Sequence, residues 1–343
     1  MSKRIETKTK DDSKYIDVTT RSKMPFQFFI GPRGTGKTFS ALRNEINNDC
    51  SGDKFIYLRN TQSEAEAATT TYGNAFKKIN SVYGTDITGQ FISKLGMGAF
   101  YKNDMADMLG YAFGLTTFAG KRSIDVSDAS RVIFEEFIPE KHVAMRKNRG
   151  DAFLHFYETC NRNRELEGDD PLIVYFLANA ISLSDDILVT FKITDDIENM
   201  IKYGERRRTI PERGIYIELV DVEISKEKEN TALYKLGIDE FNDQALKADF
   251  ANERLNLIKS AFNQRDYTPF LSYSKWCIYQ SKINGTYHIA MTNEQAKEHL
   301  IETETVLLRR LFRSTYQIEY GANRVTFDSY ETKVAIEKAL GFN

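Results

Sequence analysis

The sequence has few cysteines, little net charge and no long apolar run. Its three cysteines, Cys50, Cys160 and Cys277, lie far apart, without a CxxC pair or a histidine at zinc-ligand spacing. This pattern excludes a disulfide framework and a cysteine-based zinc site, and it is typical of reduced thiols in an intracellular protein. The formal net charge of −2 excludes a global attraction to polyanions, so any nucleic-acid contact must come from local basic features.

Signals for membranes and secretion are also missing. No stretch approaches the roughly 20 apolar residues that a membrane-spanning helix needs. The polar residues 1–14 lack the apolar core of a secretory signal. We therefore expect a cytoplasmic protein without membrane contact. Hydrophobic residues make up 41% and charged residues 28% of the chain, which is the balance of a soluble globular protein.

Short apolar runs alternate with helical stretches through much of the chain. Near-continuous runs separated by helices predict buried strands of a parallel sheet, and hence an α/β domain. Glycine-rich alternation over 85–120 predicts short antiparallel strands, and residues 62–84 predict a helix. The strands expected in the parallel sheet are residues 26–30, 54–59, 131–136, 172–180 and 214–222.

The strongest motif follows the first of these strands. It has the spacing G-x-x-x-x-G-K-[ST] of a P-loop, and a helical stretch follows it, as that motif requires. Glycines let backbone N–H groups turn toward phosphates, the lysine neutralises the outer phosphates, and the final hydroxyl ligates Mg²⁺. The motif predicts binding of ATP and Mg²⁺ by Gly31, Pro32, Arg33, Gly34, Thr35, Gly36, Lys37 and Thr38.

Two acids end the strand expected at 131–136. An apolar strand that runs into acids roughly a hundred residues after a P-loop is typical of a Walker B motif. Glu135 is expected to hold the Mg²⁺ shell, either directly or through water. Glu136 is expected to polarise the attacking water as general base.

Two further polar positions complete the predicted catalytic set. Asn179 ends the strand expected beside Walker B, where it can contact the γ-phosphate or the lytic water; a helix cap is the alternative. Arg162, in the segment 161–165, can stabilise charge on a neighbouring subunit's γ-phosphate, unless the segment is a solvated helix end. A Walker B base with a sensor strand favours the additional-strand branch of P-loop ATPases, in which ring-forming motors dominate.

The predicted organisation has three parts. Residues 1–222 are expected to form the P-loop ATPase domain, with a possible lid at 183–213. The charged stretch 223–253 is expected to be a linker or small connecting module. Residues 254–343 predict a separate small α/β domain with a hairpin turned at Asn284-Gly285.

A nuclease site is not expected in this last domain. A two-metal nuclease needs several converging carboxylates, and the predicted C-terminal strands carry none inside them. The histidines are scattered and are interpreted as structural: His142, His155, His288 and His299.

Five segments together resemble one family. FFIGPRGTGKT, FIYLRN, RVIFEEFIPEK, NRNRE and LANAIS follow one another as in the genome-packaging ATPases of small phi-29-like tailed bacteriophages. The resemblance covers about residues 26–182 and extends more faintly through 236–244 to the C-terminus. It implies an additional-strand P-loop ATPase followed by a degenerate RNase H-like domain that has lost its nuclease carboxylates.

The resemblance also implies a function. The family's subunits are expected to form a pentameric ring on the portal of an empty procapsid and to pump double-stranded DNA inward with ATP. A packaging RNA is a further partner that the resemblance allows. The protein would act in the host cytoplasm, attached transiently to the procapsid and absent from the mature virion.

Individual residues match roles in this family. Arg162 matches the arginine finger that acts on a neighbouring subunit. Arg59 matches a basic residue near the subunit interface or pore, and Lys121 and Arg122 match a loop that faces DNA. A ring repeats such cations around its channel, which raises the local field without making the monomer basic. Additional candidates for DNA contact, with a solvated helix face as the alternative, are Arg309, Arg310 and Arg313.

Two positions depart from the family pattern. Glu135 stands where the family often has aspartate, and its longer side chain leaves both direct and water-mediated contact with the metal open. The stretch Asn60-Thr61-Gln62 lacks a second positive charge that the family has after Arg59.

Three other functions share parts of the pattern. A DNA translocase of the HerA/FtsK type has the same catalytic elements but no capsid partner. A nucleotide-operated assembly protein would use the ATP site as a switch with negligible turnover. A terminase with an active nuclease requires the carboxylates that the C-terminal strands lack. The motif order favours the packaging motor, argued from the site and the resemblance together.

Overall fold

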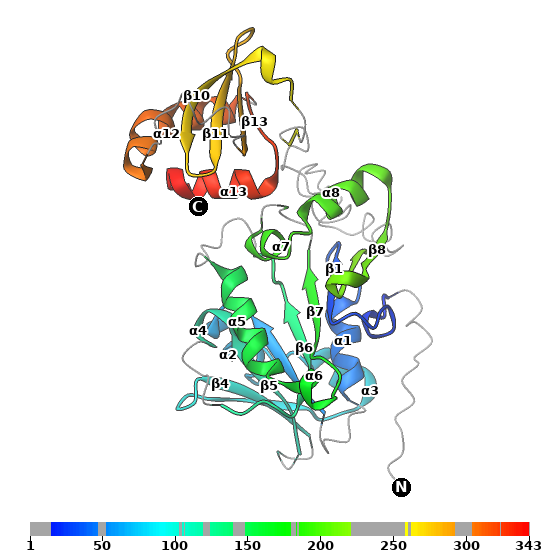
Figure 1. Cartoon of the computed structure of the whole chain (residues 1–343). Coiled ribbons are helices and arrows are strands. Elements are labelled where there is room, and N and C mark those ends of the chain that lie inside the picture. Colours follow the sequence, from blue (N-terminus) through cyan, green and yellow to red (C-terminus); the bar gives the residue numbers. More distant parts are fainter. Residues whose placement is uncertain are drawn as a thin grey trace, which may run out of the picture. The chain divides into compact units, whose positions relative to one another are not determined.

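The computed structural model divides into two compact units (Figure 1). The first comprises Met1–Ile181 and Met200–Ala251, and the second comprises Ser182–Asn199 and Asn252–Asn343. The residues that the structure describes are 15–46, 53–102, 105, 107–118, 124–139, 148–179, 183, 185–220, 258–259, 262–291, 304–322 and 324–342.

The structure describes most of the predicted lid but not the predicted linker. The linker predicted at 223–253 lies outside the described residues. The predicted lid, 183–213, runs through both units, and its action as a lid stays a prediction. Its elements are α7 (Asp186–Thr190), α8 (Thr194–Tyr203), β8 (Arg207–Ile210) and the 3₁₀ turn Pro211–Arg213.

The core of the first unit is a nine-stranded sheet with the order β3-β4-β5-β2-β6-β7-β1-β9-β8. The six central strands in this order, β5-β2-β6-β7-β1-β9, pair in parallel. Strands β3 and β4 at one edge and β8 at the other pair antiparallel. Strand β7 lies between β1 and β6, which confirms the predicted α/β class and its additional strand. Besides β8, the strands are β1 (Phe26–Ile30), β2 (Lys54–Arg59), β3 (Thr88–Ile92), β4 (Met97–Lys102), β5 (Asp107–Gly114), β6 (Ala129–Glu135), β7 (Ile173–Ala178) and β9 (Ile215–Leu219).

Helices cover both faces of this sheet. They are α1 (Lys37–Glu45), α2 (Gln62–Ala68), α3 (Lys77–Tyr83), α4 (Leu115–Phe118), α5 (Arg149–Asn161) and α6 (Arg164–Glu167). Phe134 of β6 stacks on Phe153 of α5 at a centroid distance of 5.8 Å. The preceding residue, Ile133, shares a buried cluster with Ala41 of α1. Because successive strand residues face opposite sides, cover on both faces explains why these strands are apolar at nearly every position.

The single helix predicted over 62–84 was wrong, because the chain folds back between α2 and α3. A capping box at Thr61 and Glu64 starts α2, and the Thr69 hydroxyl donates to the Glu66 carbonyl at 2.9 Å near its end. A Cβ at Gly73 would lie 2.2 Å from the Ala67 carbonyl oxygen, so the reversal needs glycine there. Asn74 then accepts from the Phe76 N–H at 2.9 Å and helps to start α3.

The second unit has its own sheet, with the order β10-β11-β12-β13. The β11–β12 pairing across Gly285, whose φ is 67°, confirms the hairpin predicted there. Strand β13 then pairs in parallel with β12 after helix α12, and Leu308 and Phe312 of that helix are buried in the core. The elements are β10 (Tyr267–Tyr273), β11 (Trp276–Ser281), β12 (Tyr287–Met291), α12 (Thr305–Gly321), β13 (Val325–Phe327) and α13 (Tyr330–Leu340). Across the described ranges of both units, no helix combines the length and apolarity needed to cross a membrane.

His288 is a buried titratable group in the second unit. Its side chain packs against Phe262 at a centroid distance of 4.0 Å, and its Nδ1 lies 2.8 Å from the Thr326 hydroxyl. Burial lowers the pKa of His288 from 6.5 to about 4, opposed by the nearby charge of Asp328. Between these two values the unfolded chain binds a proton that the folded chain does not, so acid favours unfolding.

We expect the free energy of unfolding to fall by about 3 kcal/mol as the pH drops from about 7 to about 4, in proportion to this pKa difference. The full stabilisation is present above pH 6.5 and is lost as the pH falls toward 4. Urea titrations followed by fluorescence of Trp276, the chain's single tryptophan, would report it. His288→Phe should remove most of the dependence; an unchanged acid slope in that variant would assign the loss to other groups.

Candidate nucleotide-binding and catalytic site

The P-loop turns sharply between β1 and α1, and two glycines make the turn possible. Gly34 and Gly36 have φ values of 80° and 88°, a region that strains residues with a side chain. A Cβ at Gly31 would lie 2.3 Å from the Val220 carbonyl oxygen, and one at Gly36 would lie 2.7 Å from the Cβ of Tyr15. Glycine at these positions of the motif is therefore required by close contacts with the Val220 backbone and the Tyr15 side chain.

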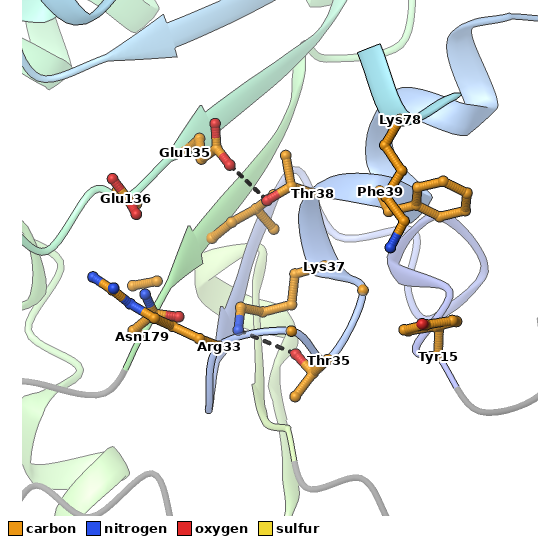
Figure 2. Close-up of a pocket in the computed structure, with 14 residues that line it drawn as sticks. Tyr15, Arg33, Thr35, Lys37, Thr38, Phe39, Lys78, Glu135, Glu136 and Asn179 are labelled. Atoms are coloured by element: carbon orange, nitrogen blue, oxygen red, sulfur yellow. Dashed lines mark hydrogen bonds between the residues drawn. The ribbon is translucent and has the colours of Figure 1, made fainter. Parts of the chain in front are cut away.

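Lys37 lies across the loop as the first residue of α1 (Figure 2). Its ammonium donates to the carbonyl oxygens of Gly31 at 2.7 Å and Pro32 at 2.9 Å, and to the Thr35 hydroxyl at 3.2 Å. The residue is only 7% exposed. A buried cation at the N-terminus of a helix marks this loop as a place where negative charge is stabilised.

Parallel strands bring the two predicted motifs together. Register pairs Glu135 of β6 with Leu177 of β7, and Ala178 with Ile30 of β1, directly before the P-loop. The Thr38 hydroxyl donates to Glu135 Oε1 at 2.7 Å, as Figure 2 shows. Hard oxygen donors of this kind are the ligands that Mg²⁺ prefers, so these two side chains fit a magnesium site.

The protein environment raises the pKa of Glu135 toward neutral pH. Burial raises its pKa from 4.5 to about 7; the Thr38 hydrogen bond and the charge of Lys37 oppose this shift, and the charge of Glu136 adds to it. A divalent cation at this position would reverse the balance, since it favours the carboxylate. Metal binding and proton release from Glu135 are therefore expected to be linked.

Glu136 follows β6 in an unusual backbone conformation. Its φ is 50°, in the left-handed region, and its side chain is 45% exposed beside the cavity. The Arg59 guanidinium donates to Glu136 Oε2 at 2.8 Å and to Glu135 Oε2 at 3.0 Å. The end of β2 thus supplies a cation that bridges both acids of the Walker B motif.

Arg59 therefore lies beside the two acids of the candidate site. Its side chain is 14% exposed, and a third carboxylate, Glu64 at the start of α2, contacts it at 3.3 Å. The resemblance grouped Arg59 with DNA-contacting residues. In the structure, its guanidinium instead contacts carboxylates of its own unit. A DNA contact of Arg59 stays a prediction. The loop residues Lys121 and Arg122 lie outside the described residues.

A cavity of about 320 Å³ lies between the P-loop and the two acids of the Walker B motif. The predicted residues that line it are Arg33, Gly34, Thr35, Gly36, Lys37, Thr38, Glu135, Glu136 and Asn179. Figure 2 shows Glu136, Arg33 and Asn179 on one side of Lys37, and Tyr15, Phe39 and Lys78 on the other. Asn179 follows β7 directly, so its place beside the cavity agrees with the sensor position predicted for it.

Arg162 is not among the described residues that line this cavity. It caps the C-terminal end of α5 with φ 48° and ψ −128°. Its side chain is 49% exposed, and its guanidinium lies 3.3 Å from the Asp125 carboxylate. About half of the Arg162 side chain is thus open to solvent, and its action on a neighbouring subunit stays a prediction.

The cations predicted on α12 have contacts inside the second unit. Arg309 Nε donates to the Ala339 carbonyl at 2.7 Å, and the Arg313 guanidinium lies 4.9 Å from the centre of the Phe342 ring. Arg310 is exposed. Within the described residues of either unit, no three His, Cys, Asp or Glu side chains gather to form a metal site.

Comparison with known proteins places this architecture in a family. Residues 15–318 match the podovirus DNA encapsidation protein (Gp16) family. The chain belongs to this family. DNA packaging proteins of Bacillus phages PZA and phi29 are 25% identical to it over 231 residues, which are 66% of this chain and 62% of each relative. The match thus spans less than two thirds of the length of these relatives.

Solved structures agree on the fold of the family. The packaging motor of Phi-28 (gp11) has a TM-score of 0.63 at 17% identity, covering 94% of this chain and 96% of its own. The phi-29 genome packaging motor assembly has a TM-score of 0.60 at 18% identity, covering 93% and 96%. The resemblance read from five short segments is therefore confirmed as family membership and as a shared fold.

Sequence reasoning missed several residues of the site. Asn60 donates to the Glu136 carbonyl oxygen, Arg149 donates to the Phe137 carbonyl oxygen, and Glu64 accepts from Arg59. Tyr15 and Phe39 line the far end of the cavity. The position of Asn60 carried a usable signal, because the ends of parallel strands meet at one sheet edge and Asn60 directly follows β2. Arg149 and Tyr15 carried none, since their places depend on how a later helix and the N-terminal segment pack.

Proposed function

We propose that this chain is an ATP-driven motor that translocates double-stranded DNA into an empty procapsid. The observation that carries the proposal is the meeting of Lys37, Thr38, Glu135 and Glu136 at one cavity, in a member of the DNA encapsidation family. Gripping through phosphates alone makes such translocation independent of sequence, as genome packaging requires.

The residues of the cavity divide the work of ATP hydrolysis. Backbone N–H groups of the P-loop and the Lys37 ammonium hold the phosphates. Thr38 and Glu135 would hold Mg²⁺, which neutralises charge on the β- and γ-phosphates when it is bound. Glu136 takes a proton from the attacking water, and Asn179 lies where a side-chain amide can orient that water or the γ-phosphate.

A ring of identical subunits supplies what one subunit lacks. Arg162, outside its own cavity, would reach the γ-phosphate of a neighbour and stabilise charge in the transition state. The ring is proposed to be pentameric, with Lys121 and Arg122 facing DNA in its channel. The portal of the procapsid is the proposed partner, with a packaging RNA as a further one. The assembly would act in the host cytoplasm, attached transiently to the procapsid, and would be absent from the mature virion.

The far end of the cavity suits a nucleobase. The Tyr15 and Phe39 rings lie with their centroids 6.3 Å apart, and the Lys78 ammonium lies 5.6 Å from the centre of each ring. Aromatic faces bind bases by stacking, worth about 1–3 kcal/mol for each base. We propose that Tyr15 and Phe39 bind the adenine of ATP.

Tyr15→Ala is expected to weaken ATP binding about tenfold, since this stacking is lost, and to leave inorganic tripolyphosphate binding unchanged within about twofold. Calorimetric titration of each ligand measures both affinities. Tyr83→Ala is the matched control, because Tyr83 packs on Phe39 at 6.2 Å but does not line the cavity. Equal losses for ATP and tripolyphosphate in Tyr15→Ala would place the base elsewhere.

The proposed function has a direct test. Purified protein should hydrolyse ATP, and DNA should stimulate the rate; with procapsids and ATP, DNA should become resistant to added nuclease. DNA-stimulated turnover with no procapsid binding would favour a capsid-independent translocase. Nucleotide binding with negligible turnover would favour an assembly switch, and metal-dependent cutting of DNA would favour a terminase with an active nuclease.

A further inference from the structure

The backbone beside Glu136 is held from two other parts of the first unit. The Asn60 side-chain amide donates to the Glu136 carbonyl oxygen at 2.6 Å. Arg149, the first residue of α5, donates to the Phe137 carbonyl oxygen at 2.6 Å and to Asn60 Oδ1 at 2.9 Å. These two side chains, called the 60–149 brace below, bind consecutive peptide carbonyls directly after the Walker B strand.

The brace is almost completely removed from water. Asn60 is 1% exposed and Arg149 is 4% exposed. Burial of a guanidinium costs free energy unless hydrogen bonds compensate for lost water. The first turn of a helix is also an unfavourable place for a cation, because the helix dipole is positive there. Stability of α5 therefore does not explain an arginine at this position, whereas its bonds to the Phe137 carbonyl and to Asn60 do.

The backbone that the brace holds is strained. Glu136 has φ 50°, and such a conformation costs a non-glycine residue about 1–3 kcal/mol. It persists only where the surroundings fix it. Phe137 is fully buried and its N–H donates to the Leu177 carbonyl at 3.3 Å, so the chain is fixed after Glu136. The bonds from Asn60 and Arg149 then set the direction in which the Glu136 side chain leaves the backbone.

Two consecutive residues at the end of β2 thus bind both the side chain and the backbone of Glu136. Arg59 binds its carboxylate and the next residue, Asn60, binds its carbonyl oxygen. Of the described residues that line the nucleotide cavity, none is Asn60 or Arg149. The brace can therefore act on the reaction through Glu136 alone, without contact to the phosphates or the base.

We propose that Asn60 and Arg149 are positioning residues that aim the carboxylate of Glu136 at the attacking water. This inference rests on the proposed ATP hydrolysis, in which Glu136 is the base. A general base works only within hydrogen-bond reach of the proton that it removes, and a displacement of about 1 Å can lower a rate about 10²-fold. Loss of the brace should therefore lower kcat and leave ATP affinity unchanged.

Asn60→Ala and Arg149→Lys in the full chain test this inference. Each is expected to lower kcat about 10²-fold, with the Kd for ATP changed less than about twofold. Arg131→Lys is the matched control, since Arg131 is another largely buried arginine, bound to Glu45 at 3.0 Å, at the opposite end of β6. That variant should lose stability and keep kcat.

A double-mutant cycle separates positioning from general damage. In the background of Glu136→Gln, Asn60→Ala should cause no further loss of rate, because the carboxylate that the brace aims is already gone. If Arg149→Lys unfolds, Asn60→Asp replaces it, because this change keeps the acceptor for Arg149 and removes the donor to Glu136. It too is expected to lower kcat about 10²-fold.

Two results would overturn the positioning role alone: an unchanged kcat in the brace variants of an active protein, or losses that multiply with Glu136→Gln. A wild-type chain that binds ATP without hydrolysing it would overturn the proposed function, and the positioning role with it. Activity of the wild-type protein thus distinguishes the two failures.

Discussion

Replacing Glu136 with glutamine should lower steady-state ATP hydrolysis about 10²–10⁴-fold, which is the usual contribution of general base catalysis. The variant should still bind ATP, because the P-loop contacts of Lys37 and the Thr38–Glu135 pair are unchanged. A phosphate-release assay measures turnover, and calorimetry with ATP and Mg²⁺ measures affinity. Bound ATP should therefore persist on this variant.

Glu135→Gln is the control for this experiment, since it alters the neighbouring acid of the same motif. It should weaken Mg²⁺-dependent ATP binding as well as turnover, because Glu135 contacts Thr38 at the proposed metal site. Loss of ATP binding in Glu136→Gln would contradict the assignment of roles. Equal effects of both changes on affinity would do the same.

Replacing Arg162 with alanine should lower turnover about 10³-fold or more, the range measured for arginine fingers that act in trans. Its own cavity keeps every described lining residue in this variant, so ATP binding should be preserved. Mixing Arg162→Ala subunits with Lys37→Ala subunits should restore part of the activity. In a mixed ring, an intact P-loop can meet an intact Arg162 from the neighbouring subunit.

Arg164→Ala is the matched control within the same short segment. The Arg164 guanidinium donates to the Ala129 carbonyl of its own β6, so its loss should cost stability and should not be rescued by mixing. Absence of rescue for Arg162→Ala at every mixing ratio would contradict a finger acting in trans. Turnover in an isolated monomer at the full rate would contradict it as well.

The sequence predicted the parts of the site that local patterns determine. Strand β1, the P-loop and α1 follow from motif spacing and an apolar run, and β6 and β7 follow from further runs that end in polar residues. Because all of these strands are parallel, their carboxyl ends meet at one edge, which brings Glu135 to Thr38. The sequence therefore predicted those site residues that lie at the end of a strand or directly after it.

The remainder depended on contacts that no local pattern encodes. Arg59 has the features of an exposed strand-end cation in the sequence, yet three acids bind it. The break between α2 and α3 follows from the fit of Gly73 against Ala67, and helical periodicity on both sides concealed it. Arg149 reaches the Phe137 carbonyl only because α5 packs on the aromatic face of the sheet.

Helix α5 begins at Arg149, a residue of the brace, and is capped at its C-terminal end by Arg162, the proposed arginine finger. Its 13 residues span about 20 Å at the rise of an α-helix, with Arg149 against the Phe137 carbonyl at one end and Arg162 just beyond the other. A short helix is stiff along its axis. If Arg162 reaches a neighbouring subunit's nucleotide, as proposed, a shift of α5 along its axis would also move Arg149 and, through it, the Phe137 carbonyl next to Glu136. Two hydrolysis sites of the proposed ring would then be coupled through one helix.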